Sequence, residues 1–259
     1  MTIKSNTVTI TVKEKTKKST NGASKDIPIS LDGIQLCILN AERLHVDSHN
    51  VSIPTKMALL ELGLEEISKA WGLLLTFEKK IFDQNPNLIK TYFELLHIDL
   101  TRYTKAIQKN EPKIKKYLSD MTFKLFLHPF DKDSFTNHRK KIKFLSKLIW
   151  YIKNITLPLL KSSQDREKFA KDILGKYVGK IDLKTADKVT SEILSINEGE
   201  LEELVSLKEK GIYVDIEGGT FINPSSRNYY PDILQNLLVL LISMSKNELT
   251  TLSKALWTS

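Results

Sequence analysis

The chain has 259 residues, of which 41% are hydrophobic and 27% are charged, and it carries a formal net charge of +8 at pH 7. This composition is that of a globular protein long enough to bury a full core, and it excludes a disordered or fibrous chain. The excess of Lys and Arg favours a polyanionic partner such as RNA. The single cysteine, Cys37, excludes an internal disulfide, so we expect a reducing, cytoplasmic location.

Membrane association is not expected from the hydropathy pattern. The first thirty residues are rich in Lys, Ser and Thr and hold no apolar segment of the kind found in signal peptides. The longest apolar run near the end, Ile233 to Met244, is interrupted by polar residues and is too short to cross a bilayer.

The chain is predicted to be all-α, with one short β-hairpin. Residues 1–30 are expected to form a flexible basic arm, in which Thr7 to Val12 alternates as a strand would. Residues 31–259 are expected to form one helical domain, with a bundle core at about 34–160. Its C-terminal helices and a β-ribbon occupy about 163–257, and the hairpin lies near 212–223, around Gly218-Gly219.

Hydrophobic periodicity and turn residues predict the individual helices. The first helix is expected to begin near Ile34. The others are expected at 54–77 and beyond, 88–108, 113–127, 137–157, 164–178, 183–209, 231–244 and 247–256. Pro54 and Pro112 stand where proline is favoured, in the first turn of a helix.

The stretch from Pro54 to Phe77 is predicted to be the central helix, because apolar residues occupy nearly its whole circumference. At 100° per residue, one narrow stripe gathers its small and polar residues: Glu61, Glu65, Ser68 and Gly72. Glu66 lies outside this stripe among apolar residues, with Lys69 one turn along. A carboxylate turned inward there needs a partner, because burying an unpaired charge is costly.

The helix that follows Ser134 offers such partners. His138 lies on its apolar face and Lys141 on the flank of that face. The opposite side carries a basic ridge that could contact RNA or could simply be solvated: Arg139, Lys140, Lys143 and Lys147.

An inward Glu66–Lys69 pair and an inward His138–Lys141 pair suit metal-independent RNA cleavage. A histidine can take the proton of a ribose 2′-hydroxyl while neighbouring cations stabilise the phosphorane. No metal or other cofactor is expected, because the remaining histidines are scattered and no phosphate-cradling glycine motif occurs. The same four residues are equally compatible with a purely structural strut between two helices.

Four blocks of the sequence resemble the AbiV abortive-infection family, which belongs to the wider HEPN group of helical bundles. They are LNAERL at 39–44, ALLELGLEEISKAW at 58–71, NHRKKI at 137–142 and KEKGIYVDIEGGTFINP at 208–224. Their order and spacing agree with the family over roughly 34 to 245. On this resemblance Glu66 and Lys69 match its EExxK element, His138 and Lys141 its HxxK element, and Tyr213 and Asp215 its GxYVD element.

The resemblance implies an HEPN-like bundle, a homodimer and a role in phage defence, through RNA cleavage or inhibition of translation. HEPN ribonucleases commonly carry Arg and His separated by four to six residues. This chain has that spacing only from Arg43 to His49, in its first helix, where the catalytic element is not expected.

Two hypotheses of different class follow. The first is a phage-defence effector that acts on RNA as a metal-independent endoribonuclease or translation inhibitor; in one variant of this hypothesis a phage-encoded activator protein must bind it first. The second is a non-catalytic binding module with a structural polar cluster, which acts through a protein or ribosome partner.

Overall fold

The computed structural model describes residues 9–12, 27–126, 146–159, 195–197, 199–200, 215–217, 220–222 and 231–258. Its helices are α1 (Leu31–Asp47), α2 (Ile53–Gln84), α3 (Pro86–Leu95), α4 (Leu100–Phe126) and α10 (Pro231–Thr258), with short helical turns η1 (Ser48–Asn50), η2 (Ile152–Thr156) and η3 (Leu157–Leu159). Residues 146–151 are also helical. The described part of the chain is therefore predominantly helical, as predicted.

Four short strands form two antiparallel ribbons. β1 (Thr9–Val12) pairs with β2 (Ile27–Ser30), and β3 (Asp215–Glu217) pairs with β4 (Thr220–Ile222), where the hairpin is predicted. Ile29 of β2 belongs to the hydrophobic core, so the packed structure begins before residue 31. The Ser30 side chain then accepts a hydrogen bond from the Gly33 N–H and caps α1.

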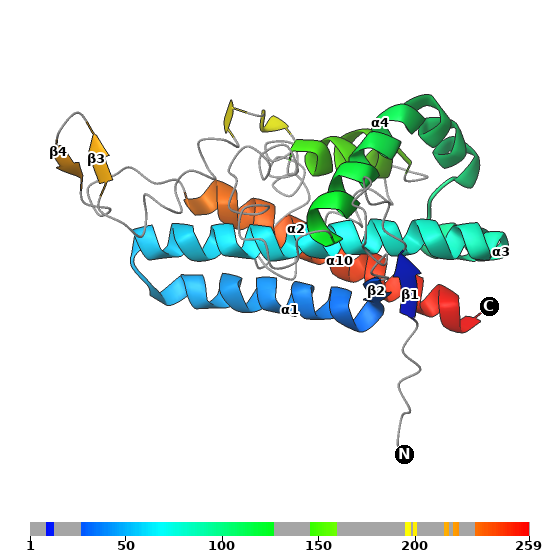
Figure 1. The fold of residues 1–259 in the computed structure, drawn as a ribbon, viewed down its shortest axis with the longest axis horizontal. Helices are drawn as coiled ribbons and strands as arrows, with labels where there is room; N and C mark the ends of the chain where they lie inside the picture. The colour runs from blue at the N-terminus through cyan, green and yellow to red at the C-terminus, as the bar shows by residue number, and fades with distance from the viewer. Residues whose placement is uncertain are drawn as a thin grey trace, which may run out of the picture.

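The core of the fold is a set of three long helices in mutual contact (Figure 1). α1 and α2 form an antiparallel pair joined by η1, and α10 packs against both. α2 has 32 residues and is about 48 Å long. It also contacts α3 and α4, so α2 contacts each of the other helices labelled in Figure 1.

Close approach of α10 to α2 depends on a glycine. A Cβ atom added at Gly63 would lie 2.6 Å from Cδ2 of Leu238, closer than carbon atoms pack. Further along the same interface the Trp71 indole N–H donates to the Leu241 carbonyl oxygen at 3.3 Å. Trp71 and Leu238 are both completely buried, so this contact joins parts of the chain that are far apart in sequence.

The Glu66 side chain, which was expected to turn into the core, is less buried than most of the polar stripe of α2. Glu61 is only 2% exposed, and Ser68 and Gly72 are also buried, whereas Glu66 lies on the half-exposed side of the helix. The Ser68 hydroxyl donates to the Leu64 carbonyl oxygen at 2.6 Å, which satisfies it within the helix. Neighbouring elements therefore cover Glu61, Ser68 and Gly72 almost completely, and they cover the Glu66 side of α2 only in part.

Two predicted helix boundaries are wrong. The helix expected over 88–108 is broken between α3 and α4, where His97 adopts a φ of 57°. Asp99 then caps α4, because its carboxylate accepts from the N–H groups of Thr101 and Arg102 at 2.9 and 3.1 Å. Pro112 lies inside α4 instead of starting a new helix, at the loss of one backbone hydrogen bond.

The two helices expected at 231–244 and 247–256 are one continuous helix, α10. The Ser245 hydroxyl donates to the Leu241 carbonyl oxygen at 2.7 Å, so this polar position does not interrupt the helix. Lys246 forms an ion pair with Glu42 of α1. The helices expected at 164–178 and 183–209 fall largely outside the described residues.

No helix in the described ranges is both long and apolar enough to span a lipid bilayer.

We predict that Gly63→Ala lowers the free energy of unfolding by about 1–2 kcal/mol, because the strain against Leu238 exceeds the gain in helix propensity. Leu238→Ala vacates the space beside Gly63. In that background Gly63→Ala should leave the free energy of unfolding unchanged or should raise it. Urea unfolding of the four proteins measures this coupling. An equal cost in both backgrounds would contradict the packing described.

Candidate functional site

The Glu66–Lys69 pair forms an ion pair within α2. The ammonium group of Lys69 donates to Oε1 of Glu66 across one helical turn. The Glu66 side chain is 21% exposed and the Lys69 side chain is 32% exposed, so the pair is shielded by its neighbours but remains accessible to solvent. A cation in this position can meet an anionic ligand without leaving its carboxylate partner.

Cys37 of α1 is close enough to this pair to sense its charges. Burial raises the pKa of the half-buried thiol, the Glu66 carboxylate raises it further, and Lys69 opposes the rise. The thiol is therefore kept protonated, which does not favour a role as a nucleophile.

Most of the other predicted site residues are not placed. His138, Lys141, Arg139, Lys140, Lys143 and Tyr213 lie outside the described residues. Asp215 lies in β3, and only its backbone is described. Lys147, predicted to be on the basic ridge, is half-buried. The structure thus brings together Glu66 and Lys69 and leaves their meeting with His138 and Lys141 as a prediction.

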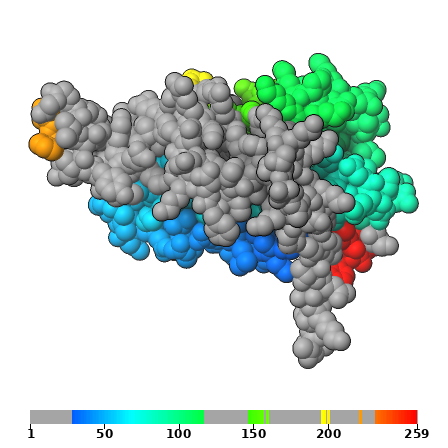
Figure 2. Space-filling view, in the orientation of Figure 1, coloured from blue at the N-terminus to red at the C-terminus, as the bar shows by residue number. Residues whose placement is uncertain are grey.

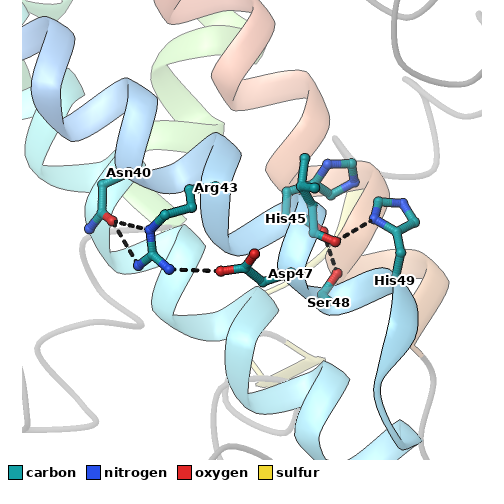
Figure 3. Close-up of polar contacts among 7 residues, drawn as sticks. Asn40, Arg43, His45, Asp47, Ser48 and His49 are labelled. Atoms are coloured by element: carbon teal, nitrogen blue, oxygen red, sulfur yellow. Dashed lines mark hydrogen bonds and ion pairs between the residues drawn. The ribbon is translucent and has the colours of Figure 1, made fainter.

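The C-terminal end of α1 carries a second group of polar side chains (Figure 3). Arg43 donates through Nη1 to the Asp47 carboxylate at 2.7 Å, and through Nε and Nη2 to the Asn40 amide oxygen at 3.2 and 3.0 Å. Both ends of its guanidinium are therefore held along the surface of its own helix.

His45 and His49 lie on the other side of this helix end from Arg43 (Figure 3). Their rings meet edge to face, with centroids 4.7 Å apart. His49 donates from Nδ1 to the Val46 carbonyl oxygen at 3.1 Å. Burial lowers the pKa of His45, and His49 and Lys56 lower it further, so this imidazole stays neutral at pH 7.

The Arg43-to-His49 spacing therefore does not produce a joint site within one chain. The arginine points along α1 toward Asp47, whereas the histidines turn to the opposite side. Nor does any group of three or more His, Cys, Asp or Glu side chains in the described ranges have the geometry of a metal site.

A buried cluster of acids and tyrosines was missed by sequence reasoning. Glu78 of α2 accepts a hydrogen bond from the Tyr92 hydroxyl of α3 at 2.6 Å. Glu248 of α10 is buried close enough to Glu78 to interact electrostatically with it. The hydroxyls of Tyr103 and Tyr151 are 3.4 Å apart and belong to α4 and the 146–151 helix. The one available signal was a glutamate inside the apolar run LLLTFEKKIF.

Burial decides the protonation of this cluster. It raises the pKa of Glu78 to about 7, although the hydrogen bond from Tyr92 opposes the rise. It raises the pKa of Glu248 well above the usual range, and the neighbouring Glu78 adds to that effect. The pKa values of Tyr92, Tyr103 and Tyr151 are raised for the same reason. Burial therefore favours the protonated forms of these carboxyl and hydroxyl groups, which lie where several helices meet.

Comparison with known proteins gives no relative: no family model, no curated protein and no solved structure matches the chain.

We predict that Glu78 makes folding stability fall as pH rises. Its folded-state pKa of about 7 exceeds its ordinary value of 4.5, so its contribution is complete below about pH 4.5 and is lost as the pH rises to about 7. Gln at this position keeps an acceptor for Tyr92 and cannot ionise. Glu78→Gln should therefore be more stable than the parent by about 3 kcal/mol at pH 8, with little difference near pH 4.5.

Denaturant unfolding between pH 4 and 8 measures this slope. Glu94→Gln is the matched control, because Glu94 is an exposed carboxylate on α3 two residues from Tyr92. The assignment is wrong if Glu78→Gln and the parent show the same pH dependence.

Proposed function

We propose that this protein is a phage-defence effector that acts on RNA, as a metal-independent endoribonuclease or as a translation inhibitor. The observation that supports the proposal is the Glu66–Lys69 ion pair, which is fixed on a rigid helix and still open to solvent. A structural ion pair has no need of a solvent path, whereas a cation that stabilises a phosphorane must reach the substrate.

In the proposed reaction His138 takes the proton of a ribose 2′-hydroxyl, whose oxygen attacks the adjacent phosphorus. The bond from phosphorus to the 5′-oxygen breaks, and that oxygen takes a proton as it leaves. The products are a 2′,3′-cyclic phosphate and a 5′-hydroxyl end. Lys69 and Lys141 stabilise the charge that develops on the phosphorane, and Glu66 holds Lys69 in place or orients His138.

The proposed effector belongs to the HEPN-like bundles and to the AbiV type among them, and the long α1–α2 antiparallel pair is compatible with that placement. Its proposed partners are RNA, a phage-encoded activator protein and a second copy of the chain. The proposed site of action is the cytoplasm.

A second candidate is a non-catalytic binding module that acts through a protein or ribosome partner. The observation that favours it is that Glu66 and Lys69 satisfy each other within one helix. Such a pair stabilises α2 without needing His138 or Lys141.

We predict that His138→Ala and Lys69→Met each lower RNA cleavage by the purified protein at least about 100-fold, the usual loss when a general base or a charge-stabilising group is removed. Lys79→Met is the matched control, because Lys79 is an exposed lysine of α2 that is also paired along the helix, with Asp83 at 3.5 Å. Incubation with total RNA, with and without phage lysate, followed by mapping of RNA ends, provides the measurement.

Circular dichroism must show that each variant remains folded. Cleavage that continues unchanged in His138→Ala and Lys69→Met would reject the catalytic assignment. Intact RNA with every protein, together with lower melting temperatures for these two variants, would favour the binding module.

A further inference from the structure

α4 carries a row of five exposed cationic side chains on one side. Their spacing of three or four residues places them within an arc of about 80° and along about 21 Å of the helix. The row consists of Arg102, Lys105, Lys109, Lys113 and Lys116. The apolar residues that attach α4 to the core, among them Ile107 and Ile114, lie on a different face. α4 forms one edge of the molecule in the space-filling view (Figure 2).

Few acidic side chains neutralise this row. Arg102 contacts Asp99 at 3.5 Å, and Lys113 lies 5.5 Å from the centre of the Trp150 ring. Among the residues whose side chains the structure describes, no acidic group pairs with Lys105, Lys109 or Lys116, and the nearby Glu111 pairs with Lys115. Like charges three or four residues apart weaken an isolated helix, so local helix stability does not account for the row.

The surroundings of the row discriminate between possible polyanions. A helix that lies on a membrane surface exposes large apolar side chains beside its cations. Within residues 99–116 no large hydrophobic side chain is exposed. The exposed neighbours are instead polar or small residues, including Thr101, Thr104 and Gln108, together with the ion pair of Glu111 and Lys115. A linear array of cations flanked by such residues suits the regularly spaced phosphates of a nucleic-acid strand.

We infer that the exposed row of α4 is an RNA-backbone binding surface. This inference rests on the proposed function for the identity of the polyanion, and it assigns the contact to α4 in addition to the ridge at 139–147. Binding there is electrostatic and independent of sequence, because ammonium groups contact phosphates and not base edges. The row would hold a strand on the enzyme while another part of the molecule acts on it.

The test measures binding without cleavage. A fluorescent single-stranded RNA in which every ribose carries a 2′-O-methyl group cannot undergo the proposed reaction, so its affinity reports on the surface alone. Lys105→Gln/Lys109→Gln should weaken binding at least tenfold at 100 mM salt. Each phosphate contact on a single strand contributes about 0.7 to the slope of log K against log salt, so the double variant should reduce that slope by about 1.4.

Lys79→Gln/Lys90→Gln is the matched control, because it removes the same charge from exposed lysines of α2 and α3 and should change the affinity little. Equal losses in the two double variants, or no loss in either, would overturn the inference. Loss of binding to vesicles rich in anionic lipid, with RNA affinity unchanged, would overturn it in favour of a membrane surface. If the parent binds the modified RNA but does not cleave unmodified RNA even with phage lysate present, the nuclease activity is rejected and the binding surface is retained.

Discussion

The contact between α2 and α10 is the constraint on which the rest of the fold depends. Gly63 lets Leu238 approach the backbone of α2, and Trp71 fastens the same interface through the Leu241 carbonyl oxygen. Because α10 also packs against α1, each of the three helices contacts the other two. α3 and α4 attach to this core and contribute Tyr92, Phe93 and Ile114 to it. The apolar residues of α4 lie on one side of the helix, which leaves another side available for charged side chains.

Ionisable groups occupy two contrasting environments in this structure. Glu78 and Glu248 are buried at a junction of helices, where the absence of water favours their protonated forms. Glu66 and Lys69 lie nearer the surface, where pairing within one helix keeps both charged groups satisfied. The first arrangement links several helices through buried groups. The second stays open to solvent, so it is the better candidate for contact with a ligand.

Periodicity predicted the long central helix and the helix before it, because apolar residues recur there without a competing signal. Periodicity missed the helix break near residue 97, because the hydrogen bond by which Asp99 caps α4 leaves the apolar pattern unchanged. Pro112 suggested a break at its own position instead, but it lies inside α4. Periodicity also placed the Glu66 side chain inward, whereas that side chain is only partly buried. A helix that is apolar nearly all round does not reveal which side its neighbours will cover. For the candidate site, the i,i+3 spacing placed Lys69 among the expected partners of Glu66, beside His138 and Lys141, and the contact with Lys69 is the one that the structure describes. The acid and tyrosine cluster joins five separate segments, and no local pattern encodes it.

The pairing of the first and last helices has a consequence for biosynthesis. Glu42 and Lys246, which link α1 to α10, are separated by 204 residues, and Trp71 and Leu241 by 170. A nascent chain on the ribosome can form helical segments early, but it cannot close this core until α10 has left the exit tunnel. Until then the part of α2 that α10 covers in the finished fold stays exposed. Completion of the core therefore waits for the synthesis of residues 231–258.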